Sequence, residues 1–369
     1  MEIMNTVECL KKKCTGCAFC ETVCPTQAIS FEVDEEGFLQ PKINLMLCSF
    51  CGNCYDKCIL STQRENMKPV NRVYAAFSLD LETRNYSTSG GVFTELAKVI
   101  LQQNGIVIGA AYQEDFSVKH EVIYDAKDIS RLSQSKYVQS DVRHIYSLLD
   151  DIDENAVVLF VGTPCQIVAF QQYMKKKKNP AVYIDFICRG VNSPRVFKYY
   201  LNELQDKNKS KITKVWFKNK ENGWNNFKTR VEFENGTFYA EDRITDAFMR
   251  GFLKHNLYMR KSCYECSFKG EKRVSDITLA DFWGVEFDNS QIDIEKGVSA
   301  VLIHSETGQK LFSLLKNSIY FEERCLEDIK KRNLCIDISI KEGDKRTEFY
   351  RRLKNEAFSK IIYDMEERK

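Results

Sequence analysis

The pattern of hydrophobic and polar positions divides the chain into two parts. In residues 28–34 and 38–43 the two kinds of position alternate around a turn at residues 35–37, which predicts a β-hairpin. From residue 73 onward, hydrophobic strand patterns alternate with amphipathic helical patterns, beginning with residues 73–79 and 92–104. We therefore expect an α+β protein in which a small N-terminal unit precedes a larger mixed α/β domain.

Local signals predict further elements in the larger part. Helices are predicted from Gly162 to about Lys175, after Ser193-Pro194, and from Ile244 to near Cys263. Strands are predicted at residues 106–112, 119–124, 157–161, 181–188, 211–218, 227–233, 237–240, 276–280 and 299–304. The charged residues 341–369 are predicted to form a helical tail. The pattern does not fix the order of the strands in the sheet.

Eight cysteines repeat one spacing in the N-terminal part. The runs are Cys14-x2-Cys17-x2-Cys20-x3-Cys24 and Cys48-x2-Cys51-x2-Cys54-x3-Cys58. Bacterial two-cluster ferredoxins have this spacing and a proline after the fourth cysteine, which binds the other cluster. Pro25 follows the first run, and Ile59 replaces proline in the second. We therefore assign one [4Fe–4S] cluster to Cys14, Cys17, Cys20 and Cys58, and another to Cys48, Cys51, Cys54 and Cys24.

Two other uses of these cysteines are weaker hypotheses. Structural zinc also accepts four thiolates with C-x2-C spacing, but two identical runs of four exceed what one zinc site requires. The four histidines lie far downstream of both runs. Disulfides are disfavoured because cysteines so close in sequence bridge poorly.

Composition and charge exclude several classes of protein. A length of 369 residues exceeds a ferredoxin module and suggests two or three domains, with a break in the polar residues 64–71. A net charge of +2 with interspersed charges gives no support for nucleic-acid binding. Hydrophobic runs fall far short of the roughly 20 residues of a membrane span, and residues 1–10 lack a hydrophobic signal core. We expect a cytoplasmic protein, because its many cysteines suit a reducing compartment.

Seven cysteines lie outside the two runs, and four of them have distinctive neighbours. Cys165 follows a strand at a helix start, where the helix dipole stabilises anionic sulfur. Cys188 ends another strand, in an equivalent position if the two strands are parallel neighbours, and Cys263 and Cys266 form a C-x2-C pair. These four predict a third cluster, although a buried, small apolar cysteine is the ordinary alternative. We expect that ordinary role for Cys9, Cys325 and Cys335.

Two further segments have the composition of a nucleotide site, although no GxGxxG or P-loop sequence occurs. The first offers hydroxyls and flexible amides at a predicted helix start, in Ser87, Thr88, Ser89, Gly90 and Gly91. Such a start binds phosphate through backbone N–H groups, but an ordinary helix cap has the same composition. The second segment combines a cation, an aromatic ring, an amide and a hydroxyl, in Lys136, Tyr137, Val138, Gln139 and Ser140. A solvated loop would have a similar composition.

Six motifs together resemble the beta-subunit family of coenzyme F420 hydrogenase and dehydrogenase, which includes 7-hydroxymethyl chlorophyll a reductase. They are STSGGVFTELA from Ser87, SKYVQSDV from Ser135, GTPCQ from Gly162, DFICRGVNSP from Asp185, CYECSFK from Cys263 and RVSDITLADFWG from Arg273. The resemblance implies bound FAD, contacted by the two segments above and by Gly162, Thr163 and Pro164. It also implies a flavin-proximal [4Fe–4S] cluster held by Cys165, Cys188, Cys263 and Cys266.

We therefore expect three regions. Residues 1–68 form a ferredoxin-like domain, residues 69–340 form a catalytic domain that binds FAD and a [4Fe–4S] cluster, and residues 341–369 form the helical tail. The implied function is an iron–sulfur flavoprotein oxidoreductase. It would pass electrons from ferredoxin or another one-electron donor through the clusters to FAD and an unknown organic acceptor. An electron-transfer subunit of a larger hydrogenase or dehydrogenase complex, F420-linked or not, is the alternative hypothesis. A zinc-stabilised scaffold is the third.

No residue identifies the acceptor or the general acid. Asp276, Asp281 and His255 are titratable candidates for the acid, and ordinary solvated side chains are the alternative. Residues 221–226 and 281–284 are candidates to cover a flavin, or else form a turn and a packed aromatic. A tryptophan in a loop, such as Trp224, must bury against something, and a ring-shaped ligand is one candidate.

Overall fold

The N-terminal unit folds as the paired cysteine runs predict. The computed structural model describes residues 6–62 and 67–367, so residues 64–66 of the predicted break and 368–369 of the predicted tail lie outside the described residues. The predicted hairpin is formed by the antiparallel strands β1 (Ile29–Val33) and β2 (Leu39–Ile43). Each cysteine run contains a short helix, α1 (Phe19–Thr22) or α2 (Asn53–Asp56).

The two short helices begin in the same way. Ala18 precedes α1 with a φ of 59°, and Gly52 precedes α2 with a φ of 76°. Both residues hold the left-handed conformation, which glycine adopts freely and alanine adopts at a cost. The internal repeat is therefore a repeat of backbone geometry as well as of cysteine spacing. A 3-10 helix, η1 (Val7–Lys13), precedes the first run.

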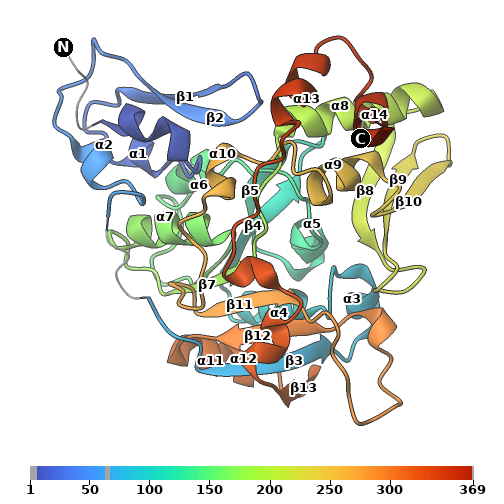
Figure 1. The fold of residues 1–369 in the computed structure, drawn as a ribbon. Coiled ribbons are helices and arrows are strands. Elements are labelled where there is room, and N and C mark those ends of the chain that lie inside the picture. Colours follow the sequence, from blue (N-terminus) through green and yellow to red (C-terminus); the bar gives the residue numbers. More distant parts are fainter. Residues whose placement is uncertain (1–5, 63–66, 368–369) are drawn as a thin grey trace.

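An eight-stranded sheet forms the centre of the larger part (Figure 1). Its strands run in the order β13 (Ile319–Glu323), β3 (Arg72–Ser78), β12 (Ser299–Ile303), β11 (Ile277–Asp281), β7 (Ala181–Phe186), β6 (Val158–Val161), β4 (Ile106–Tyr112) and β5 (Val118–Ile123). Strands β11, β7, β6 and β4 are mutually parallel, whereas both flanks of the sheet are antiparallel. The sequence did not predict β13.

Helices cover both faces of this sheet because its central strands are hydrophobic on both sides. Val107 of β4 packs in the same core as Leu96 of α4 (Val92–Gln102). The neighbouring Ile108 packs instead with Ile167 of α7 (Pro164–Met174). The alternation of side chains along β4 thus separates two hydrophobic layers. The remaining short elements are α3 (Leu81–Tyr86), η2 (Ala126–Asp128), α5 (Ile129–Leu132), α6 (Arg143–Leu148), η3 (Ile294–Lys296), α11 (Glu306–Ser313), α12 (Leu326–Lys330) and η4 (Leu334–Ile336).

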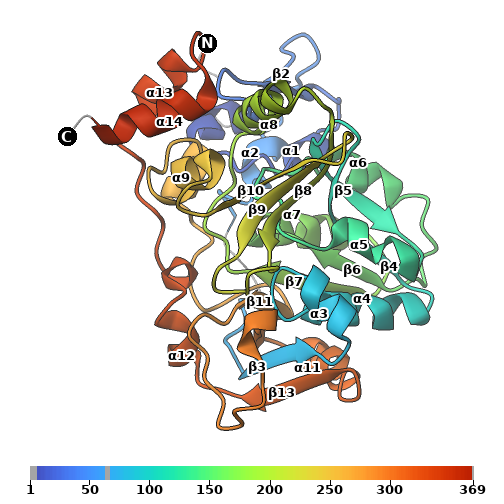
Figure 2. The ribbon, with the colours of Figure 1, turned by 90° about the vertical axis from the view of Figure 1, so that its right-hand side faces the viewer.

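A three-stranded antiparallel sheet stands beside the central sheet (Figure 2). It consists of β8 (Ile212–Asn219), β9 (Lys228–Phe233) and β10 (Phe238–Asp242). Its core includes α8 (Pro194–Asn208), α9 (Ala247–Leu253), α13 (Arg346–Arg352) and α14 (Phe358–Glu367). Residues 341–367 are thus partly helical, but they are an integral part of this core rather than a tail, because Phe349 and Ile361 are fully buried.

The prediction of one continuous helix from Ile244 to Cys263 is wrong. It is divided into α9 and the short α10 (Lys261–Tyr264). Asn256 has a φ of 52°, which an α-helix does not accommodate. The intervening Leu257, Tyr258 and Met259 are fully buried, so their hydrophobic pattern reflects packing on all sides rather than one helical face.

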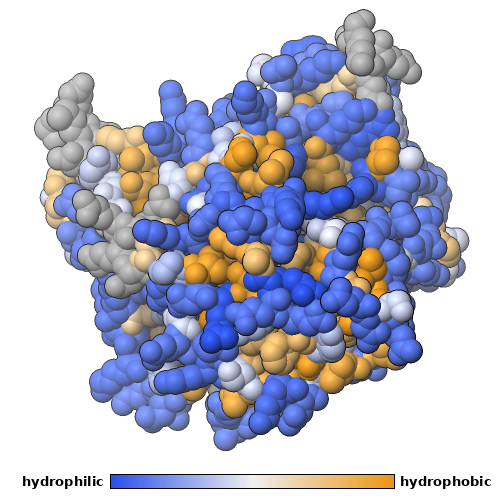
Figure 3. Space-filling view, turned by 60° about the horizontal axis from the view of Figure 1, so that its bottom comes forward, coloured by the Kyte–Doolittle hydropathy of each residue, from blue (hydrophilic) through white to orange (hydrophobic). Residues whose placement is uncertain are grey.

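On the face seen in Figure 3, hydrophobic residues form separate groups with polar residues between them. Within residues 6–62 and 67–367, no helix is both long and apolar enough to cross a bilayer.

Candidate iron–sulfur and flavin sites

The first set of cysteines meets around one cavity. Cys14, Cys17, Cys20 and Cys58 line it together. Burial raises the pKa of the Cys17 thiol to about 12, and the charges of Cys14 and Cys58 add to this effect. A cluster iron would relieve this cost, because thiolate coordination deprotonates a cysteine outright. Cys58 lies with the first run, as the crossed assignment predicts.

The second set of cysteines, Cys24, Cys48, Cys51 and Cys54, lies closer to the surface than the first set. Cys24 and Cys48 both act on the pKa of Cys54, which burial raises, so the fourth cysteine of the first run lies with the second run. Backbone N–H groups point at sulfur here, from Ala28 to Cys24 Sγ at 3.2 Å and from Val7 to Cys54 Sγ at 3.4 Å. Such bonds favour the thiolate and tune the potential of a bound cluster. Cys51 is exposed.

The first and second sets are neighbours. The charge of Cys54 contributes to raising the pKa of both Cys20 and Cys58, after burial and closer cysteines. The hydrophobic side chains of Val7, Ile29 and Ile43 pack against members of the two runs. The structure therefore places Cys24, Cys48 and Cys54 of the second set beside the first set inside the N-terminal unit.

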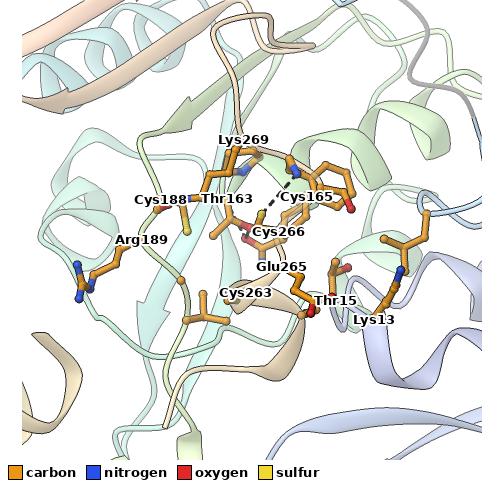
Figure 4. A pocket seen from close by; sticks show the side chains of 18 of the residues that line it. Lys13, Thr15, Thr163, Cys165, Cys188, Arg189, Cys263, Glu265, Cys266 and Lys269 are labelled. Carbon is orange, nitrogen blue, oxygen red and sulfur yellow. Dashed lines mark hydrogen bonds between the residues drawn. The ribbon is translucent and has the colours of Figure 1, made fainter. Parts of the chain in front are cut away.

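The third set meets at the carboxyl end of the central strands. Cys165 is the second residue of α7 and follows β6, and Cys188 follows β7. These two strands are parallel neighbours, as the strand-end argument requires. With Cys263 of α10 and the following Cys266, they line one cavity (Figure 4). Burial raises the pKa of Cys188 to about 12 and of Cys263 to about 11, and the other cysteines raise both further.

Polar groups surround the third set. The hydroxyl of Thr163 lies 3.1 Å from Cys165 Sγ, and the N–H of Phe268 donates to Cys266 Sγ at 3.4 Å. The ammonium of Lys269 donates to the backbone carbonyl of Cys188, and its charge lowers the pKa of that cysteine. These groups stabilise negative charge on the four sulfurs. The arrangement is what a buried anionic cluster requires.

The cysteines of the first and third sets are arranged around cavities rather than gathered at one point. In the part of the chain that the structure describes, no group of three or more His, Cys, Asp or Glu side chains is placed to hold one ion. The cysteines of the first and third sets instead surround a cavity. A cubane takes one thiolate at each of four corners, so its ligands stand farther apart than those of one ion. The geometry fits the cluster better than the zinc alternative.

One wall separates the cavity of the first cysteine set from the cavity of the third set. We call these two cavities the first cavity and the third cavity. Thr15 and Leu60 line both cavities. Both residues come from the N-terminal unit, close to Cys14 and Cys58 in the sequence, and Figure 4 shows Thr15 at one side of the third set. The first set therefore borders the cavity of the third set, and its members Cys20 and Cys58 also lie near Cys54 of the second set. No local signal marks Thr15 or Leu60 in the sequence, because their role depends on contacts across the fold.

The predicted flavin segments form a continuous chain of contacts. Ser135 N–H donates to Thr88 Oγ1 at 2.8 Å, which joins the first two segments. Gln166 Nε2 donates to Ser140 Oγ at 3.0 Å, which joins the second segment to the start of α7. Gly91 begins α4 with a φ of 89° and no side-chain cap, so this helix start leaves backbone N–H groups for a ligand.

Several side chains of these segments already have protein partners. The ammonium of Lys136 donates to the carbonyls of Arg131, Ser133 and Gln134 at 2.6–3.2 Å. Gln139 bonds to Thr15 and Arg260. These side chains therefore organise the surrounding loops. Of the thirteen predicted flavin residues, Gln139, Thr163 and Pro164 also line the third cavity. FAD binding at these segments stays a prediction, favoured by the uncapped start of α4.

The aromatic loop residue has a protein partner. Trp224 is 1% exposed and stacks on Trp283 with ring centroids 4.5 Å apart. Its Nε1 donates to Asp281, which also pairs with the buried Lys218. The packed-aromatic alternative explains its burial without a ligand.

The acid candidates also have defined surroundings. Asp276 accepts hydrogen bonds from Lys68, Ser305 and the N–H of Tyr183, and Asp281 is paired as described. Burial and nearby cations lower the pKa of His255. None of the three stands out as a general acid.

Two of the remaining cysteines differ from expectation. Cys9 and Cys325 are exposed rather than buried, and Cys335 is half-buried. Cys9 lies in the outer 3-10 helix η1, and Cys325 is the N-cap of α12. Both positions are at the ends or edges of the fold, where a small side chain need not enter a core.

Comparisons with known proteins agree with the motifs. Residues 156–329 match the family model for the carboxyl-terminal region of the coenzyme F420 hydrogenase/dehydrogenase beta subunit, and residues 13–60 match that of a 4Fe-4S dicluster domain. A solved structure of the F420-reducing [NiFe] hydrogenase complex from Methanosarcina barkeri, obtained by xenon derivatization, contains a chain with 17% identity and a TM-score of 0.48. The match covers 82% of this chain and 94% of that chain. A search of curated proteins found no match. The predicted resemblance is confirmed, and with the dicluster match it gives the chain an electron-transfer role.

Proposed function

We propose that this chain, whose residues 156–329 belong to the coenzyme F420 hydrogenase/dehydrogenase beta-subunit family, is an iron–sulfur flavoprotein oxidoreductase. Electrons enter from a ferredoxin-type donor, pass through three [4Fe–4S] clusters to FAD, and leave to an organic acceptor. The observation that supports the proposal is that the first and third cysteine sets line two cavities that share Thr15 and Leu60.

The proposed division of labour follows the three regions. Residues 1–68 hold two clusters, on Cys14, Cys17, Cys20 and Cys58 and on Cys24, Cys48, Cys51 and Cys54. Residues 69–340 hold the third, on Cys165, Cys188, Cys263 and Cys266, together with FAD. When bound, the clusters carry single electrons and FAD joins them into a two-electron reaction. Because thiolates serve metals rather than disulfides in a reducing compartment, the proposed location is the cytoplasm.

The protein's own residues set the conditions for this transfer. Backbone N–H groups and the Thr163 hydroxyl direct positive charge at sulfur, which makes each reduced cluster less costly to hold. Thr15 and Leu60 stand between the first and third sets. For FAD, the uncapped N–H groups at the start of α4 are the proposed phosphate ligands.

The second set is the proposed point of electron uptake. Cys51 is exposed, and so are Leu45, Met46, Leu47 and Phe50 around it, with Met46 at 92%. We call these four hydrophobic residues the donor patch. Residues 44–55 contain no charged side chain, so the donor patch favours a partner with an uncharged, hydrophobic contact surface.

Stepwise reduction tests the proposed path. Anaerobic holoprotein is mixed with a reduced ferredoxin, and the cluster and flavin absorption bands are followed separately. We expect both to bleach, the cluster bands first. Clusters that reduce while bound flavin stays oxidised would contradict the path from cluster to FAD, and protein purified without flavin would contradict the cofactor.

A role as one subunit of a larger complex is the second candidate. The family description names a beta subunit, and the donor patch would then be covered by a permanent partner rather than a transient donor. Purification from the native source separates the two. A stable co-purifying partner supports the subunit, whereas an isolated chain that reduces an acceptor with ferredoxin supports the enzyme.

A further inference from the structure

The N-terminal unit and the larger part are joined by a buried arginine next to two cysteine sets. We propose that Arg260 is a positioning residue that fixes the first cysteine set against the third and thereby sets the rate of electron transfer between them. This inference rests on the proposed function, because it assumes that both sets hold clusters.

Arg260 contacts both sets through hydrogen bonds. Its side-chain Nε donates to the carbonyl of Cys14 at 2.6 Å, and its own carbonyl accepts from the N–H of Cys263 at 2.9 Å. A single residue therefore connects a cysteine of the first set to a cysteine of the third. Arg260 is only 2% exposed, so these contacts are shielded from water.

The rest of the guanidinium holds the N-terminal unit in a fixed orientation. Nη2 donates to the carbonyl of Leu39 at 2.8 Å and to the Gln40 side chain at 3.2 Å. The guanidinium also lies over the ring of Phe38, 5.4 Å from its centroid. Donors in several fixed directions suit a planar guanidinium, whereas a lysine ammonium would reach only some of these acceptors.

Gln139 continues this connection to the wall between the cavities. Its Oε1 accepts from Arg260 Nη1 at 2.8 Å, and its Nε2 donates to the carbonyl of Thr15 at 3.0 Å. Thr15 is one of the two residues that line both cavities. Arg260 and Gln139 thus hold the wall as well as the cysteine loop.

Gly16 packs closely against the side chains of Arg260 and Gln139. Gly16 has a φ of 73°, and a Cβ there would lie 2.4 Å from Gln139 Nε2 and 2.8 Å from Arg260 Nη1. The backbone between Cys14 and Cys17 is therefore in close contact with the side chains of Arg260 and Gln139. A larger residue at this position would have to hold the positive φ and push the ends of Gln139 and Arg260 away.

A separate contact between the two parts provides a control. Glu36, in the hairpin turn, pairs with Arg346 of α13 and with Lys261. Ser193 also donates to the carbonyl of Glu36. The E36Q variant therefore weakens docking of the N-terminal unit without touching the Arg260 contact to Cys14.

The test compares R260K with E36Q in anaerobically purified holoprotein. One readout is the rate at which an electron taken up from a reduced donor passes from the first set to the third set, followed by freeze-quench EPR. The other is the magnetic coupling between the two reduced clusters, which depends on their spacing and needs no turnover. For R260K we expect full iron content, transfer slowed by roughly tenfold or more, and altered coupling. E36Q should leave both readouts unchanged.

A second variant keeps the inference falsifiable if R260K does not fold or loses iron. Q139L removes an acceptor of Arg260 and the donor to Thr15, and should change both readouts in the same direction by a smaller factor. Wild-type rate and coupling in a folded R260K, or in Q139L when R260K is lost, would overturn the inference. An equal effect of E36Q would also overturn it, because general docking would then be responsible. Wild-type protein without a third cluster would instead contradict the proposed function.

Discussion

Thr163 controls the charge on one sulfur of the third set, and its removal should shift the potential of the third cluster. Its hydroxyl lies 3.1 Å from Cys165 Sγ and 3.0 Å from Gln166 Oε1. A hydroxyl has one proton to donate. Once Cys165 is a thiolate it has no proton of its own, so the hydroxyl donates to sulfur and stabilises negative charge there.

The magnitude follows from the cost of losing a hydrogen bond to a charged group. Such a bond contributes about 1.5–3 kcal/mol, and only the part that differs between the oxidised and reduced cluster changes the potential. If that part is about 1 kcal/mol, the potential of T163V falls by about 40 mV, because about 59 mV corresponds to a tenfold change for one electron. T163V also removes the N-cap hydroxyl of α7, but the reciprocal bond of the capping box, from the N–H of Thr163 to Gln166 Oε1 at 3.0 Å, remains.

An anaerobic redox titration followed by EPR measures this shift. T163S keeps the hydroxyl and is the matched control, so its potential should equal that of the wild type. A T163V potential equal to that of T163S, in folded protein with full iron content, would refute the reasoning. A shift toward higher potential would refute its sign.

Three further predictions concern other parts of the chain. M46E places a charge in the donor patch and should raise the KM for ferredoxin severalfold, while reduction by dithionite, which needs no docking, stays unchanged; equal effects on both donors would contradict the donor patch. C263A should remove the third cluster, lowering iron by about four atoms per chain while the ferredoxin-type signals remain; loss of all iron would show that the sets are not independent. Burial raises the pKa of Asp246 to about 6, against hydrogen bonds from Tyr200 and Tyr239. The folded protein then binds more protons than the unfolded chain between about pH 4 and 6, so the stability of the wild type relative to D246N should fall by about 2 kcal/mol from pH 4 to pH 7 in urea unfolding. A constant difference would contradict the raised pKa.

Local patterns predicted the parts of the site that depend on local chemistry. The cysteine spacing identified two ferredoxin-type runs, and the strand ends before Cys165 and Cys188 placed these residues at one sheet edge. That argument succeeded because β6 and β7 are parallel neighbours. Hairpin and capping signals succeeded for the same reason, since each involves residues close together in sequence.

Contacts between residues that are distant in the sequence could not be predicted from local patterns. Arg260 and Cys14 are 246 positions apart, and Gln139 and Thr15 are 124 apart. Arg260 occurs in a segment whose pattern predicts a continuous helix, and no local signal pairs Gln139 with Thr15 or Arg260. Trp224 was expected to be buried, but its partner Trp283 lies far along the chain. The sequence pattern predicts a tail where α13 and α14 lie, because their charged faces obscure the hydrophobic residues that enter the core.

The number of clusters tests the central claim most directly. Anaerobically purified protein should contain about 12 iron and 12 sulfide per chain, with three EPR-distinguishable reduced clusters and no stoichiometric zinc. About 8 iron with free thiols at Cys165, Cys188, Cys263 and Cys266, or zinc in place of iron, would contradict the path from the N-terminal clusters to the third set.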